Sequence, residues 1–246
     1  MDRLGWRRQH EWQEYIANRS KGSGCPFCSG RRACPENCLQ TVNPILAVQW
    51  HPTNNGTLTP SDVTAGSGKK VWWQCNRGHT WEASINSRTK GNGCPFCSNW
   101  LVCADNCLQT IAPNLASQWH PNNNGSLTPT SVTARSKKKV WWQCEKGHEW
   151  EATIYSRRNG AGCPFCSGNR ACVDNCLQTT NPDLSKQWNI AKNNNLTPCD
   201  VTPGSNKKVW WVCDKGHEWE SIIYNRVRGN GCPYCSGRLV WAGNAT

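Results

Sequence analysis

Three cysteines and one histidine recur in this chain at a spacing that suits a tetrahedral metal ion. Cys75, His79, Cys94 and Cys97 form the pattern C-x3-H-x14-C-x2-C. Zinc in structural sites takes four sulfur and nitrogen ligands in tetrahedral geometry. The pattern therefore predicts a structural zinc site.

The same pattern occurs twice more with no change in any spacing. The further ligands are Cys144, His148, Cys163, Cys166, Cys213, His217, Cys232 and Cys235. A disulfide framework is the alternative interpretation, but disulfides do not explain a histidine that stays in register. We therefore predict three zinc ions per chain.

An incomplete copy precedes the three complete ones. His10, Cys25 and Cys28 are in register with the last three ligands, whereas Trp6 occupies the first ligand position. Three ligands with an open fourth position are also typical of catalytic zinc. Nothing near this partial metal site resembles a general base or a substrate pocket. We interpret it as a truncated copy that caps the array and holds a fourth zinc ion weakly or not at all.

Further cysteines recur as C-x3-C pairs between the zinc patterns. They are Cys34 with Cys38, Cys103 with Cys107, and Cys172 with Cys176. Each pair could form a local disulfide or remain as two buried thiols. It could also supply half of a second metal site, since two thiols cannot close a tetrahedral site alone. Cys199 has no counterpart in the other copies, and we predict no role for it.

The elements that position these ligands follow from a repeat of 69 residues, the distance between equivalent cysteines. An unbroken period indicates tandem copies of one structural unit. Residues 69–75 and 79–85 alternate in side-chain character, which predicts two strands joined by a turn at 76–78. In the connector, Asn43 and Pro44 predict the start of a short helix, and residues 59–63 carry a similar signal.

The composition also favours small units closed by metal. The 246 residues include 18 Cys and 16 Trp, and the mean hydropathy is -0.72. Small cores usually need metal or disulfide support. We therefore expect most tryptophans to form the cores around the zinc sites, with base stacking by exposed ones as the alternative. We expect an intracellular protein, cytoplasmic or nuclear, with no membrane contact, because no apolar run could span a bilayer and the N-terminal stretch lacks a signal sequence.

With its "GCPFCSG", "NCLQT" and "KKVWW" segments, the chain resembles the treble-clef or probable zinc-ribbon tandem repeat family. The resemblance implies a small metal-stabilised α+β fold of tandem β-hairpin repeats with short helical connectors, and it implies the twelve zinc ligands given above. Some members carry an endonuclease-like domain, which implies work on nucleic acid. A treble clef has a helix after its last ligand. Here Ser-Gly follows Cys28, Cys166 and Cys235, so that helix must be short or delayed.

We divide the chain by the period into a partial copy and three repeats. The partial N-terminal copy covers residues 1–33, and the repeats cover 34–102, 103–171 and 172–246.

The charge is strongly basic and is placed periodically. The formal net charge is +12, and three zinc sites, each carrying one net negative charge, reduce it to about +9. Recurrent cations of this kind suit a polyphosphate backbone, although solvated surface lysines are the simpler alternative. The candidate nucleic-acid-binding residues are Lys69, Lys70, Arg77, Arg88, Lys138, Lys139, Lys146, Arg157, Lys207, Lys208, Lys215 and Arg226.

These features favour a nonenzymatic zinc-finger array that binds DNA or RNA through its backbone. We find no phosphate loop, no nucleophile elbow and no metal-nuclease pattern, and we expect no small-molecule substrate. The alternative is a protein-interaction or targeting scaffold that binds an acidic partner protein. An enzyme that uses the N-terminal partial site is a third hypothesis.

Overall fold

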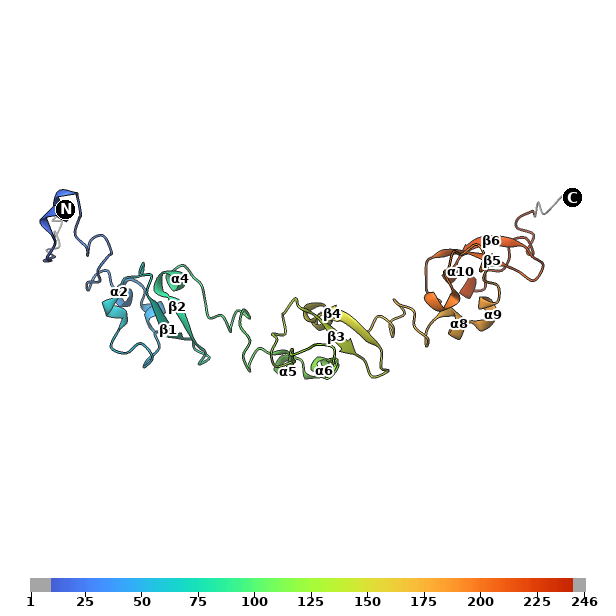
Figure 1. Ribbon diagram of the computed structural model, residues 1–246, viewed down its shortest axis with the longest axis horizontal. Coiled ribbons are helices and arrows are strands. Elements are labelled where there is room, and N and C mark those ends of the chain that lie inside the picture. The colour runs from blue at the N-terminus through green and yellow to red at the C-terminus, as the bar shows by residue number, and fades with distance from the viewer. Residues whose placement is uncertain (1–9, 241–246) are drawn as a thin grey trace, which may run out of the picture. The chain divides into compact units, whose positions relative to one another are not determined.

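The computed structural model describes residues 10–240. Trp6, which we aligned with the first ligand position, lies outside the described residues. The chain divides into two compact units between Cys107 and Leu108. The first unit holds the partial copy, the first complete repeat and residues 103–107, and the second unit holds the rest of the second repeat and the third repeat (Figure 1).

Each complete repeat contains one antiparallel hairpin, as the alternating segments predict. The strands are β1 (Lys70–Gln74) with β2 (Thr80–Ser84), β3 (Lys139–Gln143) with β4 (Glu149–Thr153), and β5 (Lys208–Val212) with β6 (Glu218–Ile222). Trp73 lies opposite Trp81 in the first hairpin, and Trp72 lies opposite Glu82. The pairing therefore places one tryptophan pair on the face that becomes the core.

The second strand ends one residue earlier than the alternation predicts. Ile85 begins a short helix instead of ending the strand, and the Ser84 side chain caps that helix by accepting from the Ser87 backbone N–H at 3.3 Å. Serine at this position is a strong N-cap. The helices α4 (Ile85–Thr89), α7 (Ile154–Arg158) and α10 (Ile223–Val227) occupy this place in the three repeats.

The connectors fold into short helices, as their cap signals predict. They are α2 (Leu39–Val42), α3 (Pro44–Ala47), α5 (Leu108–Ile111), α6 (Pro113–Ala116), α8 (Leu177–Thr180), α9 (Pro182–Ser185), and the 3-10 helices η1 (Pro60–Asp62) and η2 (Pro198–Asp200). The Asn43 side chain accepts from the Leu46 backbone N–H at 3.1 Å. The partial copy contains α1 (Ile16–Ser20).

The tryptophans supply the core of each repeat, which confirms that prediction. Trp73 is fully buried, and its indole N–H donates to the Ala83 carbonyl at 3.0 Å. Trp50 from the connector meets it edge to face, with ring centroids 5.5 Å apart. Leu39 of α2 belongs to the same core, so the connector and the hairpin fold as one body. Trp72 and its equivalents on the opposite face are only half-buried.

Turns follow the last zinc ligand of each described copy, which agrees with the expected absence of an immediate helix. After Cys97, the Trp100 N–H donates to the Pro95 carbonyl at 2.8 Å. Between residues 10 and 240, none of the helices has the length and apolar character needed to span a lipid bilayer.

Candidate metal centres

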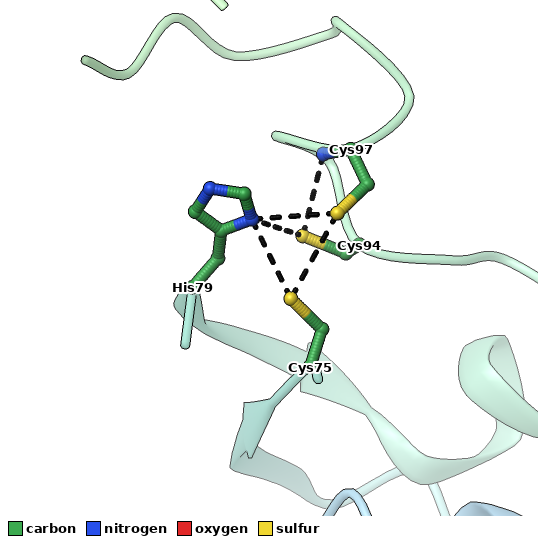
Figure 2. Close-up of side chains that lie close together, drawn as sticks. All are labelled: Cys75, His79, Cys94 and Cys97. Carbon is green, nitrogen blue, oxygen red and sulfur yellow. Dashed lines mark hydrogen bonds between the residues drawn. The ribbon is translucent and has the colours of Figure 1, made fainter. Parts of the chain in front are cut away.

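The four ligands of the first complete site converge from two structural elements. Cys75 follows β1 and His79 precedes β2, so both lie at the hairpin turn, while Cys94 and Cys97 lie on the knuckle after α4. Figure 2 shows the three sulfurs and one imidazole nitrogen facing a common centre. His79 Nδ1 lies 3.4 Å from Cys75 Sγ, 3.6 Å from Cys94 Sγ and 3.4 Å from Cys97 Sγ.

These separations fit a zinc ion. Tetrahedral zinc with Zn–S of about 2.3 Å and Zn–N of about 2.0–2.1 Å requires S···S separations of about 3.8 Å and S···N separations of about 3.6 Å. Cys75 Sγ and Cys97 Sγ are 3.8 Å apart. The donor set of three sulfurs and one nitrogen also suits zinc better than a hard cation.

The second and third repeats reproduce this geometry. Their Nδ1–Sγ distances range from 3.4 to 3.7 Å, and one S···S distance in each is 3.8 Å. The chain therefore has three Cys3His zinc sites, formed by the twelve ligands that the spacing predicts.

The local backbone prepares the thiolates for the metal. Gly78 adopts a φ of 81°, which closes the turn so that the Cys75 N–H can donate to the His79 carbonyl at 3.1 Å. In the knuckle, the Cys97 N–H points at Cys94 Sγ at 3.5 Å. Hydrogen bonds of this kind favour the charged form of the sulfur.

Two thiols of one site differ strongly in acidity before metal binds. Burial raises the pKa of Cys75, but hydrogen bonds with the backbone N–H groups of Arg77 and His79 and with the Cys97 and Cys94 thiols outweigh burial and lower that pKa to about 7. Burial and the neighbouring thiols Cys94 and Cys75 raise the pKa of Cys97 to about 12. A divalent ion is therefore needed to hold all three thiolates together.

A carboxylate outside the ligand set contacts each of the first two histidines. His79 Nε2 lies 3.1 Å from Asp105 Oδ2, and His148 Nε2 lies 3.2 Å from Asp174 Oδ2. A proton on Nε2 that bonds the carboxylate leaves Nδ1 free to bind zinc. Cys103 Sγ also lies 3.6 Å from His79 Nε2.

These contacts give a role to the first cysteine of the C-x3-C pairs and to the acidic residue inside each pair. The sequence analysis did not identify these acidic residues. The middle of each pair is Glu36, Asp105 or Asp174, each 69 residues from the next. None of the described cysteines forms a disulfide. The first cysteine of the pair lies beside the preceding histidine, and the second, such as Cys38, is buried at the start of a connector helix.

The partial copy retains the geometry of its three ligands. His10 Nδ1 lies 3.6 Å from Cys25 Sγ and 3.5 Å from Cys28 Sγ. His10 Nε2 lies 3.8 Å from Glu36 Oε2, a longer contact than those of the complete sites. A fourth, weakly held zinc ion at this site stays a prediction.

Three of the predicted nucleic-acid-binding arginines are buried, so this assignment was wrong for them. Arg88 is 6% exposed, and its guanidinium carbon lies 5.2 Å from the Trp73 ring and 5.1 Å from the Trp81 ring. It donates to the Asn92 carbonyl and to Gln49 Oε1. Arg157 and Arg226 make the same contacts in their repeats.

The buried arginine has an electrostatic role beside the metal. Burial lowers the pKa of Arg88, and the charges of Cys94 and Cys75 oppose that shift. A zinc ion with three thiolates carries one net negative charge. The guanidinium therefore balances the charge of the complete site inside a core of indoles.

The other nine predicted cations are exposed. They are Lys69, Lys70, Arg77, Lys138, Lys139, Lys146, Lys207, Lys208 and Lys215. Two of them pair with strand carboxylates, since Lys139 Nζ lies 2.6 Å from Glu151 and Lys208 Nζ lies 2.8 Å from Glu220. Both pairs are exposed, so each contributes little stability.

Comparison with known proteins gives a family match for all three repeats. The family described as "Probable Treble clef zinc finger domain" matches residues 46–100, 115–169 and 184–238. Each match begins within or near the connector helix and ends just after the knuckle of the same repeat.

Two viral proteins are similar to this chain over part of their length. The "Putative endonuclease" of Escherichia phage T5 is 30% identical over 99 residues, which are 40% of this chain and 32% of that protein. "Uncharacterized protein R635" of Acanthamoeba polyphaga mimivirus is 25% identical over 164 residues, which are 59% of this chain and 39% of that protein. The chain thus spans well under half the length of the relatives it matches.

Proposed function

Because the chain belongs to the probable treble clef zinc finger domain family, we propose that it is a nonenzymatic zinc-finger array that binds nucleic acid through the phosphate backbone. In this proposal, zinc folds each repeat, and the exposed cations make the contacts. Selectivity for base sequence is low, because lysine and arginine on phosphate fix position without reading sequence.

The observation that carries this proposal is the recurrence of exposed cations on the zinc-stabilised hairpins. Lys69, Lys138 and Lys207 precede the first strand of each hairpin, and the three repeats expose a cation in each hairpin turn. With zinc bound, the net charge stays near +9. Neutralising phosphates with such cations releases counterions and drives binding.

The similarity to a protein named "Putative endonuclease" gives independent support. An endonuclease must hold a nucleic acid in order to cut it. The chain matches only 32% of that protein, and we assign substrate binding rather than cleavage to the shared part.

The histidines outside the zinc ligand sets have contacts that fit loop support rather than catalysis. His120 is 5% exposed, its Nδ1 accepts from the Asn122 and Asn123 N–H groups at 3.1 Å, and its Nε2 lies 3.0 Å from Glu149. His51 Nδ1 accepts from two backbone N–H groups of the equivalent loop. These contacts support a nonenzymatic role.

A salt series with the zinc-loaded full chain tests the proposal. Labelled duplex DNA, single-stranded DNA and single-stranded RNA are titrated from low to physiological salt, and log affinity is plotted against log salt. We expect a linear fall. The double variant Lys138→Glu, Lys139→Glu should flatten the slope on duplex DNA by up to about 1.8, because each phosphate that the protein no longer neutralises removes about 0.9 from it.

The control variant is Lys186→Glu, Lys192→Glu, which reverses two exposed connector lysines that lie outside the recurrent hairpin cations. It should leave the slope unchanged, and both variants should keep the wild-type zinc content. If the zinc-loaded protein shifts no nucleic acid at low salt, the proposal is wrong, and a scaffold for an acidic partner protein becomes the better hypothesis.

A further inference from the structure

Two junctions between successive copies contain a similar polar cleft, which is lined by a zinc knuckle and by the connector that follows it. The first cleft has a volume of about 400 Å³, and Arg31, Arg32, Ser67 and Lys69 contribute to its walls. The second has a volume of about 500 Å³. Arg170, Ser205 and Lys207 contribute to its walls. We call these two sets of residues, together with Asp62 and Asp200, the knuckle clefts.

Hydrogen bonds between the two walls fix each cleft. In the first cleft, the Thr64 hydroxyl donates to the Gly30 carbonyl of the knuckle at 3.0 Å, and the Thr202 hydroxyl donates to Gly168 in the same way at 3.0 Å. Asn37 adds a bond from its side-chain amide to the Phe27 carbonyl at 2.7 Å. These bonds fix the backbone segments that carry the cations, which reduces the entropy lost on binding.

The side chains of the first cleft suit an anion with several oxygens. Arg32 and Lys69 supply charged donors from opposite walls. The Ser67 hydroxyl lines the same cleft and accepts from the Lys69 N–H at 3.2 Å. Arg31 also lines the cleft, and its guanidinium donates to the Gly24 carbonyl at 3.0 Å. Guanidinium and ammonium groups together are common phosphate ligands.

Each cleft also contains one carboxylate, but that carboxylate is engaged. Asp62 Oδ2 accepts from the Thr59 N–H at 2.8 Å and from the Thr59 hydroxyl at 2.6 Å, and Asp200 makes the same bonds with Thr197. The first cleft has three cationic side chains and one carboxylate, and the second has two cationic side chains and one carboxylate. Both clefts therefore keep a net positive charge.

The junction between the first and second complete repeats provides a natural contrast in sequence. Trp100 and Leu101 occupy the positions of Arg31 and Arg32, whereas Lys138 remains at the position of Lys69. Both replacing side chains are exposed, Trp100 by 86% and Leu101 by 51%. An arginine on the knuckle and a lysine on the following connector therefore occur together at two junctions, those with Arg32 and Arg170, and not at the junction with Leu101.

We propose that the knuckle clefts are the principal phosphodiester-binding sites of the array, each taking a backbone phosphate between the knuckle arginine and the connector lysine. This inference rests on the proposed function and names the atoms that perform it. It also makes the hairpin-turn cations secondary contacts.

The test compares two quadruple variants that each remove four positive charges. The cleft variant is Arg32→Ala, Lys69→Ala, Arg170→Ala, Lys207→Ala. The matched control is Lys70→Ala, Arg77→Ala, Lys208→Ala, Lys215→Ala, which removes exposed cations outside the clefts. Zinc content and circular dichroism confirm that both variants fold, and binding to labelled duplex and single-stranded DNA is measured from about 50 to about 200 mM salt.

We expect the cleft variant to bind at least about tenfold more weakly than the control and its salt slope on duplex DNA to fall by about 1.8, one step of about 0.9 for each cleft. Equal weakening in the two variants would overturn the cleft assignment and leave the proposed function standing. Failure of the wild-type chain to bind any nucleic acid would remove both proposals.

A second measurement uses inorganic phosphate alone. In ¹H–¹⁵N spectra of the zinc-loaded chain, phosphate should shift the amides of residues 67–69 and 205–207 in a saturable way and leave those of residues 136–138 unchanged. Shifts of the same size in all three segments, or none in the clefts, would contradict the proposal. The proposal would also be contradicted if phosphate shifted the cleft amides saturably but the cleft variant bound DNA as tightly as the wild type. The clefts would then bind free anions only.

Discussion

At the scale of single residues, the zinc ligands could be predicted from sequence, but their supporting contacts could not. A metal restricts its ligands to a few side-chain types, so Cys144 and His148 are visible in their spacing alone. The hydrogen bond from His79 to Asp105 joins residues 26 positions apart and depends on how the chain returns to the knuckle. Its periodic acidic residue was a usable signal, although it was weaker than the cysteines that flank it.

We predict that Asp105→Ala weakens zinc binding at the first site by about 10- to 100-fold, because the carboxylate orients the histidine and fixes its tautomer. Titration of the zinc-loaded chain with a chromogenic chelator should release one ion earlier than the others. Asp105→Asn, which keeps an acceptor oxygen, should restore part of the affinity.

The second site provides the internal control for this experiment, because Asp174 still contacts His148. Nitrogen-15 spectra of the zinc-loaded chain should show faster exchange of the His79 Nε2 proton with water in the alanine variant, because its acceptor is gone, while His148 is unchanged. Release of all three ions at the wild-type chelator concentration would show that the carboxylate does not support the metal.

At the scale of elements, the sequence predicted the start of the connector helix correctly, but it placed the end of the second strand one residue too late. Asn43 and Pro44 start a helix as predicted. The alternation through Ile85 resembles a strand, yet Ile85 begins α4, which the Ser84 side chain caps. The helix places Arg88 against the indoles of the hairpin, so a residue that was predicted to be a surface cation is buried.

We predict that Arg88→Ala destabilises the first hairpin by about 3 kcal/mol, since it leaves the charge of the zinc site without its buried partner. Hydrogen exchange of the β1 and β2 amides, read by mass spectrometry, measures this local stability. Lys90→Ala, two residues further and exposed, should change it by less than about 0.5 kcal/mol.

The same pair of variants decides between a structural and a binding role. Arg88→Ala should keep the wild-type salt slope for DNA binding under conditions where the protein stays zinc-loaded. An unchanged hairpin together with a flatter slope would instead make Arg88 a phosphate contact.

At the scale of the whole chain, the 69-residue period predicted the number of sites, while the limits of each folded body followed from contacts. Residues 34–102 were predicted as one repeat, and that partition stays a prediction. However, Asp105 and Cys103, which it assigns to the next repeat, contact His79 of the preceding site. The sites of His79 and His148 are therefore each supported by a carboxylate from the start of the following repeat. The period cannot reveal this link, because a repeat has the same length wherever its boundary is drawn.

The separate cores lead to a prediction about the whole chain. Trp142, Trp150 and Cys163 belong to one core and Trp211, Trp219 and Cys232 to another, so the middle and third repeats each have their own buried cluster. Zinc binding and folding are coupled in small sites of this kind. We therefore predict that Cys144→Ser lowers the zinc content from three ions to two and unfolds the middle hairpin, while the first and third hairpins persist.

Elemental analysis gives the zinc count, and hydrogen exchange locates the change, which should appear as weaker protection in β3 and β4 with protection kept in β1 and β5. Cys199→Ser is the matched control, because Cys199 is exposed and lies outside the ligand sets. It should keep all three ions and normal exchange. If Cys144→Ser also keeps three ions and melts like the wild type, Cys144 is not a ligand. If instead every hairpin loses protection together, the repeats fold as one cooperative body and their separate cores do not confer separate stability.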